Sequence, residues 1–367
     1  TQSFSLKAVQ AALDDDEAVV DYYWLDRLTL LIITIDREAA VPELRPMTED
    51  DRSRLERFAA FVMTFSQVSP PGYLDTVKEF SSILLPSAEK AMAVLESKGR
   101  LVVSPHRLLH SIPFHALLWK RGYVIEKFAV SYVPNLTSLT LRFAPAREQR
   151  VLAVGVGEYE VPGWPLAPLP QADEEVEDLT RLYEGRGKPI VTLRGPDGGE
   201  KKLQELGEEG TLGASTRLHF ATHGFNVSGD TPLESHLFLR DSLLDGLEIS
   251  QWNLNAELVV LSACCSAQQA IAGRGMDELP GDELFGLQAA FFAAGARRVL
   301  GCLWPVDTFA AKDITRSFHE ELEKGAAPEV ALQAATRDYL QRAGPLRRKV
   351  FYWAPFALSC LGRPDRL

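Results

Sequence analysis

Two stretches decide the fold: Arg217-Leu218-His219-Phe220-Ala221-Thr222-His223-Gly224 and Leu258-Val259-Val260-Leu261-Ser262-Ala263-Cys264-Cys265. Each begins as an apolar run typical of a buried strand and ends at a reactive side chain followed by small residues. Ligands of parallel α/β sheets bind beyond the carboxyl ends of the strands. One strand end offers an imidazole and the other a thiol, so we expect a reactive site at that edge of a sheet.

Strand patterns alternate with helical patterns in the second part of the chain. Apolar runs at 151–156, 190–193, 258–264 and 298–304 are separated by amphipathic segments such as 173–183 and 308–324, and 357–361 is expected to be the last strand. This alternation predicts an α/β fold with a mostly parallel sheet covered by helices on both faces.

The first part of the chain has a different pattern. Segments 18–24 and 28–35 predict a β-hairpin, and Thr48-x-x-Asp51 resembles a capping box that opens a helical region reaching about residue 97. The polar, proline-punctuated stretch 144–150 is the best boundary. We therefore predict an N-terminal half, residues 1–150, and a C-terminal half, residues 151–367.

Composition narrows the class of protein. With 46% hydrophobic and 24% charged residues the chain is typical of a soluble globular protein, and its net charge of -11 does not favour nucleic acid as a direct partner. Residues 1–13 lack a signal pattern, and no apolar run approaches the roughly 20 residues of a membrane span. We expect a cytoplasmic protein with no membrane partner. Four cysteines without CxxC spacing predict no metal site, and no motif predicts a cofactor.

His223 and Cys264 carry the predicted chemistry. In an extended strand His219 and His223 point to one face, and Gly224 lets the backbone approach a ligand closely. A histidine beside a cysteine can take the thiol proton, and the thiolate is the nucleophile. We predict Cys264 as nucleophile and His223 as general base, with amides near Gly224 and Cys264 binding the oxyanion. His219 is expected to be structural, and Cys265 is a rival nucleophile that strand alternation directs to the opposite face.

Several motifs together resemble the CHAT domain, a bacterial cysteine-protease domain related to separase and caspases. They are LHFATHG (218–224), VLSAC (260–264), AAGAR (293–297), LWPVD (303–307), VSPHRLLHSIPFHAL (103–117) and LPQADEE (169–175). The resemblance covers nearly the whole chain. It implies a caspase-like catalytic half that contains the His223–Cys264 dyad, preceded by a degenerate caspase-like half without one.

The resemblance also gives Asp307 two alternative roles. An acid in this region of separase-like relatives lines the pocket for the residue before the cleaved bond, where a carboxylate pairs with arginine. Asp307 also precedes a helical segment, where aspartate commonly serves as the N-cap. Both roles stay open at this point.

What the resemblance implies about function is a cysteine endopeptidase that cleaves a partner protein. The expected setting is bacterial defence or programmed cell death, with a gasdermin or another effector as substrate and an activating protein as a second partner. Most relatives carry helical repeats before this domain, so we expect a stand-alone effector or an excised domain. The competing hypothesis is a caspase-like binding or scaffold module whose dyad is silent.

Overall fold

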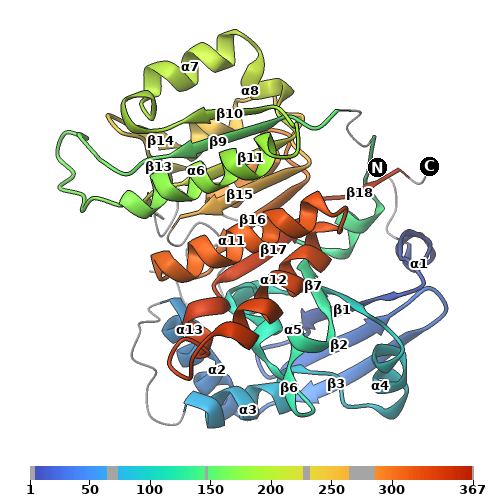
Figure 1. The fold of residues 1–367 in the computed structure, drawn as a ribbon. Coiled ribbons are helices and arrows are strands. Elements are labelled where there is room, and N and C mark those ends of the chain that lie inside the picture. The colour runs from blue at the N-terminus through green and yellow to red at the C-terminus, as the bar shows by residue number, and fades with distance from the viewer. Residues whose placement is uncertain (1–4, 64–72, 145–147, 226–231, 264–285, 366–367) are drawn as a thin grey trace.

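The structure is a computed structural model that describes residues 5–63, 73–144, 148–225, 232–263 and 286–365 (Figure 1). Among these residues, strands from both predicted halves join in one sheet. From one edge to the other these strands are β10 (Ile190–Leu193), β9 (Val151–Gly155), β11 (Arg217–Ala221), β15 (Leu258–Ser262), β16 (Arg298–Cys302), β17 (Phe356–Cys360), β7 (Ala129–Tyr132), β4 (Arg100–Ser104), β1 (Glu17–Trp24), β2 (Thr29–Ile35) and β3 (Ala40–Pro46).

Most neighbouring strands of this sheet run parallel. The antiparallel pairs are β16 with β17, β1 with β2, and β2 with β3. The prediction of a mostly parallel sheet is therefore confirmed, and so is the β1–β2 hairpin, in which Tyr22 lies opposite Ile32.

Helices cover both faces of the sheet, as predicted. On one face lie α2 (Glu49–Met63), α3 (Tyr73–Leu84), α4 (Glu89–Glu96), α5 (Val124–Lys127), α6 (Pro170–Glu184), α11 (Thr308–Glu323), α12 (Pro328–Arg342) and α13 (Val350–Trp353). On the other face lie α1 (Leu6–Ala12), α7 (Glu200–Glu208), α8 (Thr211–Ala214), α9 (Gly246–Ser250) and α10 (Leu287–Ala293). Strand residues alternate between the two cores: Leu258 and Val260 pack on the first face, and Val259 and Leu261 on the second.

Strand β17 joins the two predicted halves. It pairs antiparallel with β16 on one side and parallel with β7 on the other, where Ser359 is the partner of Tyr132. An apolar core on the first face also contains residues of both halves, such as Val103 and Leu300. The last predicted strand thus lies inside the sheet (Figure 1). The division of the chain after residue 150 stays a prediction.

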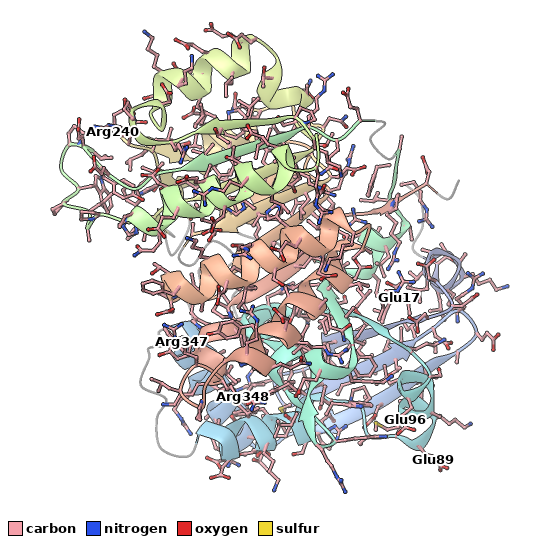
Figure 2. All side chains as sticks on the ribbon, in the orientation of Figure 1. Glu17, Glu89, Glu96, Arg240, Arg347 and Arg348 are labelled. Atoms are coloured by element: carbon pink, nitrogen blue, oxygen red, sulfur yellow. The ribbon has the colours of Figure 1, made fainter. Side chains whose placement is uncertain are left out.

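Shorter elements complete the fold. The small strands are β12 (Gly224–Phe225), β13 (His236–Phe238) and β14 (Leu243–Asp245) in one sheet, β5 (Leu118–Trp119) with β6 (Gly122–Tyr123), and β8 (Arg142–Phe143) with β18 (Arg363–Pro364). Single 3-10 turns are η1 (Arg107–Ser111), η2 (Phe114–Ala116), η3 (Leu136–Thr140), η4 (Gly195–Asp197) and η5 (Pro232–Glu234). Figure 2 shows charged side chains on the outside of these layers, among them the exposed Glu89, Glu96, Arg347 and Arg348.

Candidate active site

His223 lies just beyond the carboxyl end of β11, which ends at Ala221. Its Nε2 atom is 2.9 Å from the carbonyl oxygen of Ala167. Because a carbonyl oxygen can only accept, Nε2 carries the proton, and in the neutral ring Nδ1 has the lone pair that a base needs. The Ala167 carbonyl therefore orients the imidazole for proton transfer.

Tyr159 supports the same histidine from the loop after β9. The two rings are tilted against each other with centroids 4.9 Å apart. The Tyr159 hydroxyl accepts from the backbone N–H of His223 at 3.1 Å and donates to the carbonyl of Val156 at 2.7 Å. Sequence reasoning missed both Tyr159 and Ala167, because no motif signals a loop tyrosine or a backbone carbonyl as a partner of histidine.

The strand expected to carry the thiol runs beside β11. Strands β11 and β15 pair in parallel, with Ala221 next to Ser262, and the N–H of Thr222 donates to the carbonyl of Ser262 at 3.4 Å. Cys264 and the rival Cys265 lie outside the described residues. Parallel strands that pair in register end on the same side of the sheet, so Ser262, the last residue of β15, lies on the side where His223 follows β11.

Gly224, the predicted oxyanion donor, belongs to strand β12. It lies opposite Leu237 in an antiparallel pair with β13, and the preceding His223 carbonyl accepts from the N–H of Phe238 at 3.0 Å. In an antiparallel ladder hydrogen-bonded pairs alternate with pairs that are not hydrogen bonded. Gly224 therefore occupies a position whose N–H points away from β13, as an oxyanion donor requires.

A pocket of about 80 Å³ opens beside His223, between α6, α11 and the ends of β11 and β15. The residues that line it are Leu169, Gln171, Ala172, Glu175, Ala221, Thr222, His223, Ser262, Val306, Thr308 and Ala311. Among these described residues, Glu175 is the one carboxylate. It is only 4% exposed.

Asp307 caps α11. Its Oδ1 atom accepts from the backbone N–H of Ala310 at 3.0 Å, which confirms the N-cap alternative. Its neighbours Val306 and Thr308 line the pocket. A role of Asp307 in substrate recognition stays a prediction.

His219 is fully buried and is not itself a lining residue of the pocket, although it contacts the lining residue Glu175 of α6 and His319 of α11. Within the described ranges, no group of three or more histidine, cysteine, aspartate or glutamate side chains could hold a metal ion. No described helix is both long and apolar enough to cross a membrane.

Comparison with known proteins defines the class. The chain superimposes on the separase of Saccharomyces cerevisiae, solved as a separase–securin complex, with a TM-score of 0.54, 11% sequence identity, and coverage of 97% of this chain and 30% of that chain. The fold is therefore the caspase-like α/β fold of separase. A family model of the CHAT domain matches residues 75–362. The chain belongs to the CHAT domain family.

Two curated relatives match this chain over only a small part of their own length. The chain is 26% identical over 299 residues to tetratricopeptide repeat protein 28 of Mus musculus, which covers 69% of this chain and 11% of the relative. The Homo sapiens protein of the same name is 25% identical over 273 residues, covering 62% of this chain and 11% of the relative. The chain thus spans about a tenth of the length of these relatives.

Proposed function

We propose that this chain is a cysteine endopeptidase that hydrolyses peptide bonds of a partner protein through Cys264 and His223. The observation that carries the proposal is the parallel pairing of β11 and β15, with Ala221 beside Ser262. This pairing supports the proposal because β11 ends two residues before His223 and its neighbour β15 ends two residues before Cys264. The Ala167 carbonyl leaves the His223 ring with Nδ1 as its basic atom.

The reaction begins when Nδ1 of His223 takes the proton of the Cys264 thiol. The thiolate attacks the carbonyl carbon of the scissile peptide bond, and the N–H groups of Gly224 and Cys264 bind the resulting oxyanion. The C–N bond then breaks as the imidazolium gives its proton to the leaving amine, which leaves a thioester. Water, deprotonated by His223, attacks the thioester and releases the carboxylic acid and the thiol.

The proposed substrate is a partner protein, in a setting of bacterial defence or programmed cell death. Kinship with the CHAT family favours an effector such as a gasdermin, and the crystallised separase is bound to securin, which supports regulation by a protein partner. A cytoplasmic location belongs to the same proposal.

The test is identification of new protein N-termini in cells that express the wild-type chain, the Cys264→Ala variant or the Cys265→Ala variant. We expect cleavage products with wild type and Cys265→Ala, and none with Cys264→Ala. Cleavage products that are lost in Cys265→Ala and kept in Cys264→Ala would identify Cys265 as the nucleophile. Identical N-termini in all three samples, together with no labelling of Cys264 by a peptide-based electrophile, would leave the silent scaffold module as the function.

A further inference from the structure

Glu175 of α6 is a buried carboxylate that links the elements around the pocket. Its Oε2 atom accepts from the hydroxyl of Ser262, the last residue of β15, at 3.1 Å. Its Oε1 atom accepts from the hydroxyl of Thr315 on α11 at 2.6 Å. Nε2 of His219 on β11 lies 3.0 Å from the same oxygen, within ion-pair distance although its N–H points off the line between the atoms. One carboxylate therefore touches the strand of the base, the strand of the nucleophile and a covering helix.

A chain of buried side chains orients His219. Nδ1 of His219 lies 3.3 Å from Nε2 of His319, and Nδ1 of His319 lies 2.9 Å from the hydroxyl of Tyr183. Arg217 donates to the Tyr183 oxygen at 3.1 Å. Burial raises the pKa of Tyr183, and burial together with the charges of His219 and Arg217 lowers the pKa of His319 well below 6.5.

The protonation states of Tyr183 and His319 fix which atom donates and which accepts in the hydrogen bonds that link Tyr183, His319 and His219. Tyr183 keeps its proton, and the acceptor among its described contacts is Nδ1 of His319. Neutral His319 then carries its proton on Nε2 and donates to Nδ1 of His219. Nε2 of His219 is the ring nitrogen that faces Glu175. His219 therefore lies within ion-pair distance of the carboxylate without a hydrogen bond from Nε2 among the described residues.

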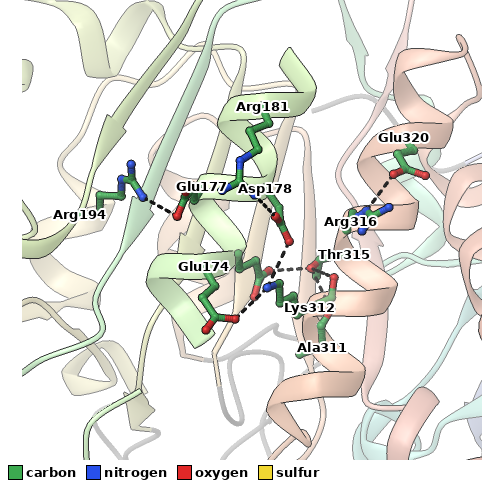
Figure 3. Close-up of polar contacts among 11 residues, drawn as sticks. Glu174, Glu177, Asp178, Arg181, Arg194, Ala311, Lys312, Thr315, Arg316 and Glu320 are labelled. Atoms are coloured by element: carbon green, nitrogen blue, oxygen red, sulfur yellow. Dashed lines mark hydrogen bonds and ion pairs between the residues drawn. The ribbon is translucent and has the colours of Figure 1, made fainter. Parts of the chain in front are cut away.

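The neighbouring acids of α6 make separate contacts with α11. Glu174 and Asp178 both pair with Lys312, at 2.9 and 3.2 Å, in the row of ion pairs that Figure 3 shows between the two helices. These pairs are partly exposed and hold α6 against α11 without contact to Ser262. Glu174 is therefore a matched control for Glu175, one residue away on the same helix and on the same helix pair.

We propose that Glu175 is a positioning residue, which anchors the end of β15 through Ser262 and thereby sets the thiol of Cys264 against His223. This inference rests on the proposed peptidase. Both partners of the hydrogen bond from Ser262 to Glu175 are buried, and shielding from water makes such a bond electrostatically stronger. Ser262 is two residues before Cys264, so a shift at Ser262 passes to the thiol. A misplacement of about 1 Å can lower a rate roughly 100-fold.

The experiment compares Glu175→Gln, Ser262→Ala, the double variant and the control Glu174→Gln. Labelling of Cys264 by a peptide acyloxymethyl ketone measures the competence of the site, and hydrogen–deuterium exchange of residues 258–263 measures the anchoring. We expect each single variant to slow labelling about 10- to 100-fold and to speed exchange at the end of β15. The double variant should be no slower than Ser262→Ala alone, because both substitutions act on the same hydrogen bond: Glu175→Gln weakens it and Ser262→Ala removes it.

Several results would overturn the inference. One is unchanged exchange and labelling in Glu175→Gln and Ser262→Ala; another is an equal loss in Glu174→Gln, which would mean that packing of α6 alone is responsible. Ser262→Ala keeps the carboxylate and its contact with Thr315, so it reports on the anchor even where Glu175→Gln folds poorly. If the ketone does not label the wild-type chain, the proposed peptidase function is refuted. The hydrogen–deuterium exchange data then test separately whether Glu175 anchors the end of β15.

Discussion

Acid should destabilise this protein through histidines whose ring nitrogens are kept from water, and His110, a half-buried residue whose Nε2 atom is buried, is one case. His110 lies in the 3-10 turn η1, and burial, with a smaller contribution from the charge of His106, lowers its pKa from 6.5 to about 3. Its Nε2 atom has no hydrogen-bond partner among the residues that the structure describes. The folded protein therefore holds this ring neutral, whereas the unfolded chain protonates it at its ordinary pKa.

The sign and size of the effect follow from proton linkage. Between pH 6.5 and about 3 the unfolded state binds one more proton at His110 than the folded state, so the free energy of unfolding falls as the pH falls. From pH 7.5 to 5.5 the loss is about 1.4 kcal/mol for this residue. Burial also lowers the pKa values of His106 and His115 to about 4, so the three together cost about 4 kcal/mol at pH 5.5. A loss of that size is large compared with a typical free energy of unfolding of about 5–15 kcal/mol.

Chemical denaturation at pH 7.5, 6.5 and 5.5 measures this loss for the wild type and for His110→Leu. We expect the variant to lose about 1.4 kcal/mol less than the wild type between pH 7.5 and 5.5. Ser111→Ala, in the same turn, removes a buried hydroxyl that does not titrate, so its effect should be the same at each pH. Parallel curves for wild type and His110→Leu would refute the reasoning, because the ring would then be protonated in the folded state.

Three further predictions concern single residues. Asp307→Asn should keep the cap of α11 and the stability of the protein while lowering any preference for cleavage after basic residues. Asp307→Ala should lower the free energy of unfolding by about 1 kcal/mol in chemical denaturation. An unchanged cleavage preference in both variants would show that Asp307 takes no part in substrate recognition. Gly295→Ala should lower the free energy of unfolding by more than about 1 kcal/mol, because Gly295 has φ +112 and a Cβ there would come within 2.4 Å of the Leu254 carbonyl oxygen; equal denaturation midpoints would contradict this. Tyr159→Phe keeps the ring beside His223 but removes the acceptor of its N–H, so labelling of Cys264 should slow by about tenfold, roughly 1.4 kcal/mol, and an unchanged rate would show that the ring alone suffices.

Elements with local signals were predictable from the sequence. Thr48 and Asp51 form the expected capping box, with both reciprocal hydrogen bonds present at 3.0 and 3.1 Å. Strand β3 was missed, because its prolines and charged residues break the apolar alternation. Such a strand is tolerated at the edge of a sheet, where a missing N–H needs no partner.

The site was predictable only where its chemistry belongs to a side chain at a strand end. His223 and Gly224 stand out because a histidine and a glycine follow an apolar run. The partner of the His223 ring is a backbone carbonyl at Ala167, which any residue type would supply. The contact of Glu175 with His219 joins residues 44 positions apart and depends on how α6 packs on the sheet.

The central place of β17 has a consequence for the order in which the protein can assemble. During synthesis all the remaining strands of the main sheet leave the ribosome before residues 356–360 of β17. Until then β16 and β7 are edges without their shared neighbour, and unpaired edges invite pairing with other chains. The sheet, and with it the edge where His223 lies, can be completed only after that last strand inserts between two preformed parts. The nascent chain of this protein should therefore need protection from aggregation late in synthesis.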